Sequence, residues 1–97
     1  MLSPMDFDNG IKIQSGTEAF ETSIASYATG ELTVTFPEAF NTVPNVVAST
    51  KGVFTPQREI SEPLVKAVNK TQVTFRVYNA YSGGALTPSI SWIAVGT

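Results

Sequence analysis

The sequence of 97 residues contains no cysteine and no histidine. Without cysteine, the chain has no disulfide bonds and no thiol nucleophile. Without histidine, it has no imidazole base, and the usual Cys/His zinc sites are excluded as well. We therefore expect a protein that is not an enzyme and that needs no cofactor.

Positive charge is also scarce, with six lysines and arginines against eight acidic residues and a formal net charge of −2. The six basic residues are scattered, so we expect no nucleic acid partner and no anionic membrane partner. No apolar run approaches the roughly 20 residues of a membrane span, and the first ten residues do not resemble a signal peptide. The prediction is synthesis in the cytoplasm, without a signal peptide and without membrane insertion.

The carboxylates do not form a recognisable metal or catalytic motif. The stretch DFDNG, residues 6–10, is the nearest approach to a calcium loop, but it lacks that loop's spacing and is expected to be a solvated turn. A glycosidase would need two carboxylates about 5 to 9.5 Å apart in a cleft, and the sequence marks out no such pair. We predict no metal site.

The sequence is instead rich in short segments with the alternating pattern of β-strands. In residues 31–37, Leu32, Val34 and Phe36 alternate with threonines, and in residues 10–15 the alternation predicts that Ile11 and Ile13 face inward. An Asn69-Lys70 turn predicts a hairpin, because asparagine tolerates positive φ. The six predicted strands are residues 10–15, 31–37, 44–50, 62–69, 72–79 and 89–95.

Residues 17–27, TEAFETSIASY, show near-helical spacing of apolar residues, but the stretch is short and rich in Ser and Thr, so a turn or irregular loop is at least as well supported. In residues 72–79, alternation with Phe75 and Val77 turns Arg76 outward, where it could pair across the sheet.

The terminal strand is apolar on both faces. Ile90, Trp92 and Ala94 share one face, which we expect to lie in the core, while Ile93 and Val95 point the opposite way. In a two-layer domain, the second face needs cover from a loop or from another chain. Together, the segments predict one antiparallel all-β domain, a sandwich or small barrel, over residues 10–97, with residues 1–9 as an N-terminal arm or linker.

Three motifs occur in a fixed order along the chain: KIQSG at residues 12–16, VTFPEAFNTVPNVVAST at residues 34–50, and SISWIAVGT at residues 89–97. This order resembles the H-type lectin domain, and it also resembles the C-terminal domains of bacteriophage tail fibres. The resemblance implies a six-stranded antiparallel β-sandwich that assembles as a homotrimer and binds sugars, often galactose or N-acetylgalactosamine.

The resemblance also implies where a carbohydrate would bind. Sugar-binding members use an acidic residue after the SG motif, an arginine before the fourth strand and a Trp-His pair before the last strand. Glu18 and Arg58 match the first two positions, whereas the Trp-His pair falls on Ala80 and Tyr81. The sequence therefore departs from the lectin pattern there, although Tyr81 could stack on a sugar and Asn79 could bind its hydroxyls.

Two hypotheses follow for the function. The first is a carbohydrate-binding module that recognises a host cell-surface glycan at the end of a phage or phage-like tail fibre. The second is a structural trimerisation or capping domain of such a fibre, with no ligand. The absence of cysteine favours a virion protein over a secreted, disulfide-stabilised lectin. We accordingly expect a location in the virion tail or outside the cell.

Overall fold

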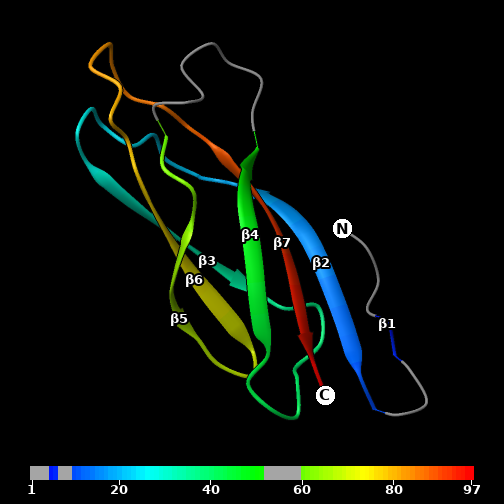
Figure 1. The fold of residues 1–97 in the computed structure, drawn as a ribbon. Helices are drawn as coiled ribbons and strands as arrows, with labels where there is room; N and C mark the ends of the chain where they lie inside the picture. Colours follow the sequence, from blue (N-terminus) through cyan, green and yellow to red (C-terminus); the bar gives the residue numbers. More distant parts are fainter. Residues whose placement is uncertain (1–4, 7–9, 52–59) are drawn as a thin grey trace.

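The computed structural model describes residues 5–6, 10–51 and 60–97, which form two antiparallel β-sheets stacked as a sandwich (Figure 1). One sheet has the strand order β1-β2-β7-β4 and the other has the order β3-β6-β5. The strands are β1 (Met5–Asp6), β2 (Lys12–Ala19), β3 (Thr29–Thr35), β4 (Asn45–Lys51), β5 (Leu64–Val68), β6 (Gln72–Tyr78) and β7 (Ser89–Gly96).

The predicted six-stranded antiparallel sandwich is confirmed, since each predicted segment overlaps one of the strands β2 to β7. The two-residue strand β1 adds to this set and pairs with the start of β2. It lies within the predicted N-terminal arm, whose boundary at residue 10 stays a prediction. The described part of the chain has no helix, and so none that could cross a membrane.

The core lies between the two sheets and follows the predicted alternation. Its centre is formed by Phe75 of β6 and by Ile90 and Trp92 of β7, all of them buried. Phe36 joins the layers, because its ring centroid lies 5.7 Å from that of Trp92 and 5.0 Å from that of Phe40. Trp92 is buried although it lies close to the C-terminus, because β7 is an inner strand of its sheet and supplies the centre of the core.

The inward face of β2 was predicted wrongly. Ile11 is partly exposed, whereas Lys12 and Gln14 are only 8% and 1% exposed. The Lys12 ammonium lies 2.7 Å from a Glu38 carboxylate oxygen. The Gln14 amide donates to the Glu38 carbonyl at 2.7 Å and accepts from the Glu38 backbone N–H at 2.9 Å. Because these partners satisfy both polar groups, the polar face of β2 can be the buried one.

The hairpin between β5 and β6 is confirmed, but Asn69 stabilises its turn in a different way from the one predicted. Its backbone does not have positive φ. Instead, its side-chain oxygen accepts hydrogen bonds from the backbone N–H groups of Thr71 and Gln72, at 2.8 and 2.9 Å. The turn is therefore held by the asparagine side chain, a common alternative to left-handed backbone geometry.

Residues 17–27 contain no helix. Strand β2 runs on to Ala19, and an irregular segment follows in which Phe20 and Ile24 are buried. Ile24 forms an isolated bridge with Leu86, so backbone pairing across the chain replaces helical hydrogen bonds. Burial of these two apolar residues accounts for the spacing that mimics a helix.

The C-terminal strand is anchored on both sides. It lies between β2 and β4 in the sheet, and the carbonyl of Thr97 accepts a hydrogen bond of 2.6 Å from the backbone of Asn41. The Thr97 and Thr42 hydroxyls are 2.7 Å apart. These contacts hold the last residues of the chain against the sheet, where free ends would otherwise fray.

Candidate functional site

The outer face of the four-stranded sheet carries exposed apolar side chains. In the register of the sheet, Ile93 lies between Ser15 of β2 and Val47 of β4. Ile93 is 46% exposed, Val47 is 68% exposed and the neighbouring Val95 is 39% exposed. The prediction that β7 is apolar on both faces is confirmed, and nothing among the described residues buries its outer face.

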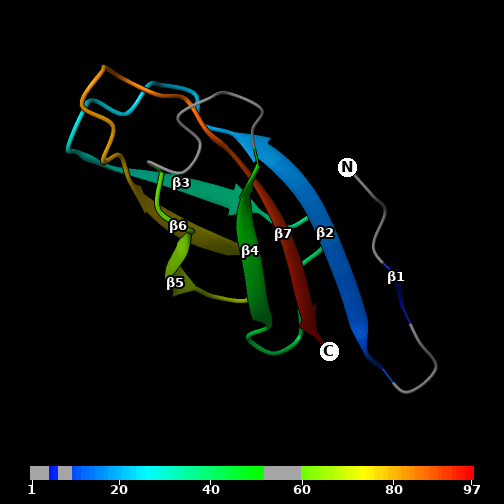
Figure 2. The same cartoon turned by 45° about the horizontal axis from the view of Figure 1, so that its top comes forward.

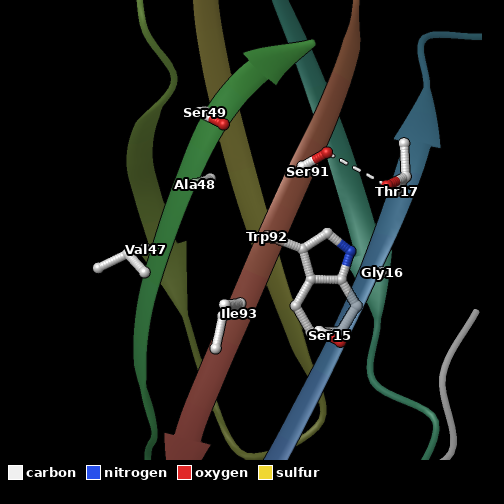
Figure 3. A pocket seen from close by; sticks show the side chains of 9 residues that line it. All are labelled: Ser15, Gly16, Thr17, Val47, Ala48, Ser49, Ser91, Trp92 and Ile93. Atoms are coloured by element: carbon white, nitrogen blue, oxygen red, sulfur yellow. Dashed lines mark hydrogen bonds between the residues drawn. The ribbon is translucent and has the colours of Figure 1, made fainter.

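A hollow of about 610 Å³ lies along this face. Figure 3 shows the side chains that line it. It is lined by residues 15–17 of β2, 47–49 of β4 and 91–93 of β7. Hydroxyl groups border the apolar side chains, and those of Thr17 and Ser91 are 3.2 Å apart. Such a mixed surface can pack against another protein chain or contact a hydroxyl-rich ligand.

The outer face of the three-stranded sheet is polar and charged. Glu31 of β3 lies 2.8 Å from the Lys66 ammonium and 3.1 Å from the Arg76 guanidinium. The hydrogen bond from Lys66, followed by that from Arg76, lowers the pKa of the Glu31 carboxyl. The hydroxyls of Thr33 and Thr74 are 2.9 Å apart on the same face. The outward direction and cross-sheet pairing predicted for Arg76 are confirmed.

One end of the sandwich gathers two loops from distant parts of the sequence (Figures 1 and 2). The segment after β2 and the segment between β6 and β7 are joined by backbone hydrogen bonds from Phe20 to Pro88 and from Ile24 to Leu86, of 3.0 and 2.7 Å. This end therefore brings together two of the regions in which the sequence predicted site residues.

The prediction that Asn79 contacts a ligand is not supported by its position, because the residue is fully buried. Its amide nitrogen donates to the carbonyls of Ile24 and Gly84, at 2.9 and 3.1 Å. Its side-chain oxygen accepts from the Tyr81 backbone N–H at 2.8 Å. Since every polar atom of the side chain is engaged, Asn79 ties the two loops together.

Tyr81 and Glu18 lie at this same end of the sandwich. Tyr81 is half-buried, and its ring lies over Gly83 so closely that a Cβ at Gly83 would collide with it. Glu18, near the end of β2, is partly buried, and its side chain makes no hydrogen bond or ion pair within the described ranges. Arg58 lies outside the described residues. The role of these three residues in carbohydrate binding stays a prediction.

The described residues offer no group of three acidic side chains that could hold a metal ion. Asp8, in the stretch compared with a calcium loop, lies outside those residues.

Comparison with family models decides the family, because residues 6–97 match the model described as "Putative tail fiber protein gp53-like, C-terminal". The chain belongs to this family of tail fibre C-terminal domains. The narrower assignment of this tail fibre domain to the H-type lectins stays a prediction. No curated protein sequence matches the domain.

Solved structures of pyocin fibres share the fold of the tail fibre domain. An N-truncated R1-type pyocin tail fibre matches with a TM-score of 0.70 and 23% identity, over 93% of this chain and 74% of that chain. The C-terminal part of the P. aeruginosa R1 pyocin fibre matches with a TM-score of 0.71 and 21% identity, over 93% of this chain and 24% of that chain. The corresponding R2 pyocin fibre gives a TM-score of 0.61 and 23% identity, over 93% and 22%. This chain thus spans about a quarter of the longer fibre fragments.

The three motifs that mark the tail fibre domain form one packing unit. Lys12 and Gln14 of the first motif bind Glu38 of the second. Gly16 of the first lies against Trp92 of the third, and a Cβ at Gly16 would lie 3.1 Å from the indole ring. The three motifs are thus in contact in the folded chain, where they join β2 to β7 and to the segment after β3.

Two exposed tyrosines were not singled out by the sequence. Tyr27 is 61% exposed and Tyr78 is 41% exposed. The alternation of β6 predicts that the Tyr78 side chain faces outward, so its exposure could have been predicted from the sequence. Tyr27 lies in the irregular segment after β2, where the near-helical spacing of the sequence does not correspond to a helix and so does not indicate which side chains are exposed.

Proposed function

We propose that this domain is a receptor-binding module of a phage or phage-like tail fibre that binds carbohydrate on the host cell surface. The observation that carries the proposal is the match of residues 6–97 to a family of tail fibre C-terminal domains. The arrangement of the loops supports it, because loops held against a rigid sheet are where binding residues commonly lie. The proposal includes a location in the virion tail and no catalytic activity.

The proposal further assigns the outer face of β2, β7 and β4 to contacts between copies of the chain in a homotrimer. Ile93, Val95 and Val47 are the apolar residues that such contacts would bury. Exposed apolar surface of this kind is commonly covered by an obligate partner. Three copies would also present three sugar sites together, which raises avidity well above that of a single site.

Within this proposal, Tyr81 is the residue of the 79–88 loop that would stack on a sugar ring, with Glu18 and Arg58 supplying charged contacts. Substitution of Tyr81 by alanine keeps the backbone N–H that Asn79 binds, so the loop should retain its anchor. The experiment compares parent and Tyr81→Ala on a glycan array and on host cells, with melting temperature and molar mass measured on both.

Loss of a stacking aromatic costs about 1 to 3 kcal/mol per site, by analogy with base stacking, and avidity multiplies the loss. We expect Tyr81→Ala to retain its fold and mass but to bind much more weakly to the glycans that the 79–88 loop recognises. Parental binding by this variant would remove Tyr81 from the site. If the parent itself binds neither glycans nor cells, the structural trimerisation or capping role replaces carbohydrate binding.

A further inference from the structure

Tyr27 has a backbone conformation that its residue type disfavours. Its φ is +58°, and it is the one non-glycine residue among those described that has positive φ. The Ala28 backbone N–H donates to the Ala25 carbonyl at 3.1 Å, which closes a four-residue turn with Tyr27 as its third residue. Glycine or asparagine normally takes this position, because a bulky side chain there is strained.

The surrounding backbone keeps Tyr27 in place despite this strain. Its N–H donates to the Asn79 carbonyl at 2.6 Å, and the Asn79 N–H donates to the Ala28 carbonyl at 2.9 Å. Asn79 is itself fully buried, so this pairing is part of the rigid end of the sandwich. Strain that the fold tolerates in order to expose a large side chain points to a function for that side chain.

Tyr27 does not stand alone on this surface. Tyr78, 41% exposed, pairs with Thr29 and directly precedes the residue that binds the Tyr27 backbone. On the other side of β6, Leu64 is 59% exposed and pairs with Arg76, two residues from Tyr78. The three apolar side chains therefore come from β5, β6 and the turn before β3, at one end of the three-stranded sheet.

The charged cluster of this sheet adjoins the aromatic residues. Glu31 pairs with Arg76 in the register and binds both Arg76 and Lys66, so two positive charges face one negative charge. The three side chains of this cluster sum to a charge of +1, although the chain as a whole has a net charge of −2. A saccharide ring suits exposed tyrosines, which offer an apolar ring face and a hydroxyl, and a carboxylate suits arginine.

We propose that Tyr27, Tyr78 and Leu64, together with Arg76 and Lys66, form a binding surface for an anionic saccharide. This surface is distinct from the 79–88 loop, although the inference rests on the proposed function of carbohydrate binding. A protein partner of obligate type fits less well, because lysine and glutamate, which form this cluster with Arg76, are depleted in such interfaces. The saccharide's ring would lie on a tyrosine, and its carboxylate would bind Arg76.

The test measures binding of the whole chain to an array of bacterial polysaccharides that contain uronic or sialic acid, with neutral galactans as matched probes. Tyr27→Gly is the central variant, since it removes the aromatic ring and also relieves the disfavoured φ. We expect its melting temperature to be unchanged or raised and its binding to acidic glycans to fall about 10-fold or more per site. Tyr27→Asn, which also tolerates positive φ, should behave in the same way.

The control variants separate the alternatives. Tyr81→Ala should keep its binding to the acidic glycans if the ligand lies on the tyrosine surface, and Arg76→Gln should reduce the preference for acidic over neutral probes. Parental binding by Tyr27→Gly, equal binding of acidic and neutral probes, or a changed molar mass for Tyr27→Gly would each overturn the inference. Binding by the parent that is lost only in Tyr81→Ala would preserve the proposed function and reject this surface. A parent that binds nothing on the array or on cells rejects both.

Discussion

The two sheets share one core, but their outer faces differ in chemical character. The four-stranded sheet exposes Val47, Ile93 and Val95 among serines and threonines. The three-stranded sheet exposes threonines, the Glu31 cluster and, at one end, Tyr27 and Tyr78. On both sheets the outward-facing residues of the strands alternate with residues that pack in the shared core. Packing of the core therefore does not account for the difference between the two outer faces.

The contrast indicates that the faces meet different surroundings. Apolar side chains on a sheet face are stabilised when another chain covers them, whereas ion pairs and hydroxyls remain compatible with water and with hydrated ligands. We therefore propose contacts between copies for the four-stranded face and an anionic saccharide for the three-stranded face, in addition to the site proposed at the 79–88 loop. Within one small sandwich, the outer positions of the strands can separate assembly from recognition.

The largest expected effect tests the assumption that both faces depend on one core. Trp92→Ala should lower the free energy of unfolding by about 3 to 5 kcal/mol, since the indole is buried between the sheets. Trp92→Phe should cost much less, because it keeps an aromatic ring and because the indole N–H has no hydrogen-bond partner among the described residues. Thermal unfolding followed by circular dichroism checks both. An unchanged melting temperature for Trp92→Ala would mean that the indole does not support the core.

A smaller effect on folding but a large one on assembly is expected for Ile93→Asp. The new charge would lie in the middle of the apolar outer face, where an interface between copies would have to bury it. Light scattering should show a trimer for the parent and a monomer for the variant. Thr35→Asp places the same charge on the outer face of the three-stranded sheet and should leave the mass unchanged. A monomeric parent at high concentration would contradict the assignment of this face.

The smallest effect concerns Glu31. Because Lys66 and Arg76 lower the pKa of its carboxyl, the unfolded chain binds more protons at this site in mildly acidic solution. Its stabilising contribution is present above the ordinary glutamate pKa and is lost as the pH falls through the lowered value. We expect Glu31→Gln to melt slightly below the parent at pH 7 and the difference to shrink as the pH falls below the ordinary glutamate pKa. Screening by salt should also reduce it, since the group is exposed. A difference that does not shrink as the solution is acidified would show that the carboxylate charge is not its cause.

How much of the candidate site the sequence could predict differs from residue to residue. The outward direction of Arg76 and Tyr78 follows from the period of two in β6. The burial of Asn79 could not be predicted in this way, because its partners Ile24 and Gly84 are supplied by two loops that meet only in the folded chain. The exposed position of Tyr27 likewise depends on a turn held by the backbone of Asn79.

The sequence by itself determined the strands, the inward faces of β3, β6 and β7 and the absence of thiol and imidazole chemistry, because these depend on residue type and local alternation. Tertiary structure alone decided which face of β2 is buried. Alternation places Ile11 and Ile13 on one face of the chain and Lys12 and Gln14 on the other face, but it does not say which pair is buried. Glu38, more than twenty residues away in the sequence, supplies the partners that make the polar pair stable in the interior. Contacts over such distances in sequence decide burial, because a polar group is buried only where the folded chain satisfies it.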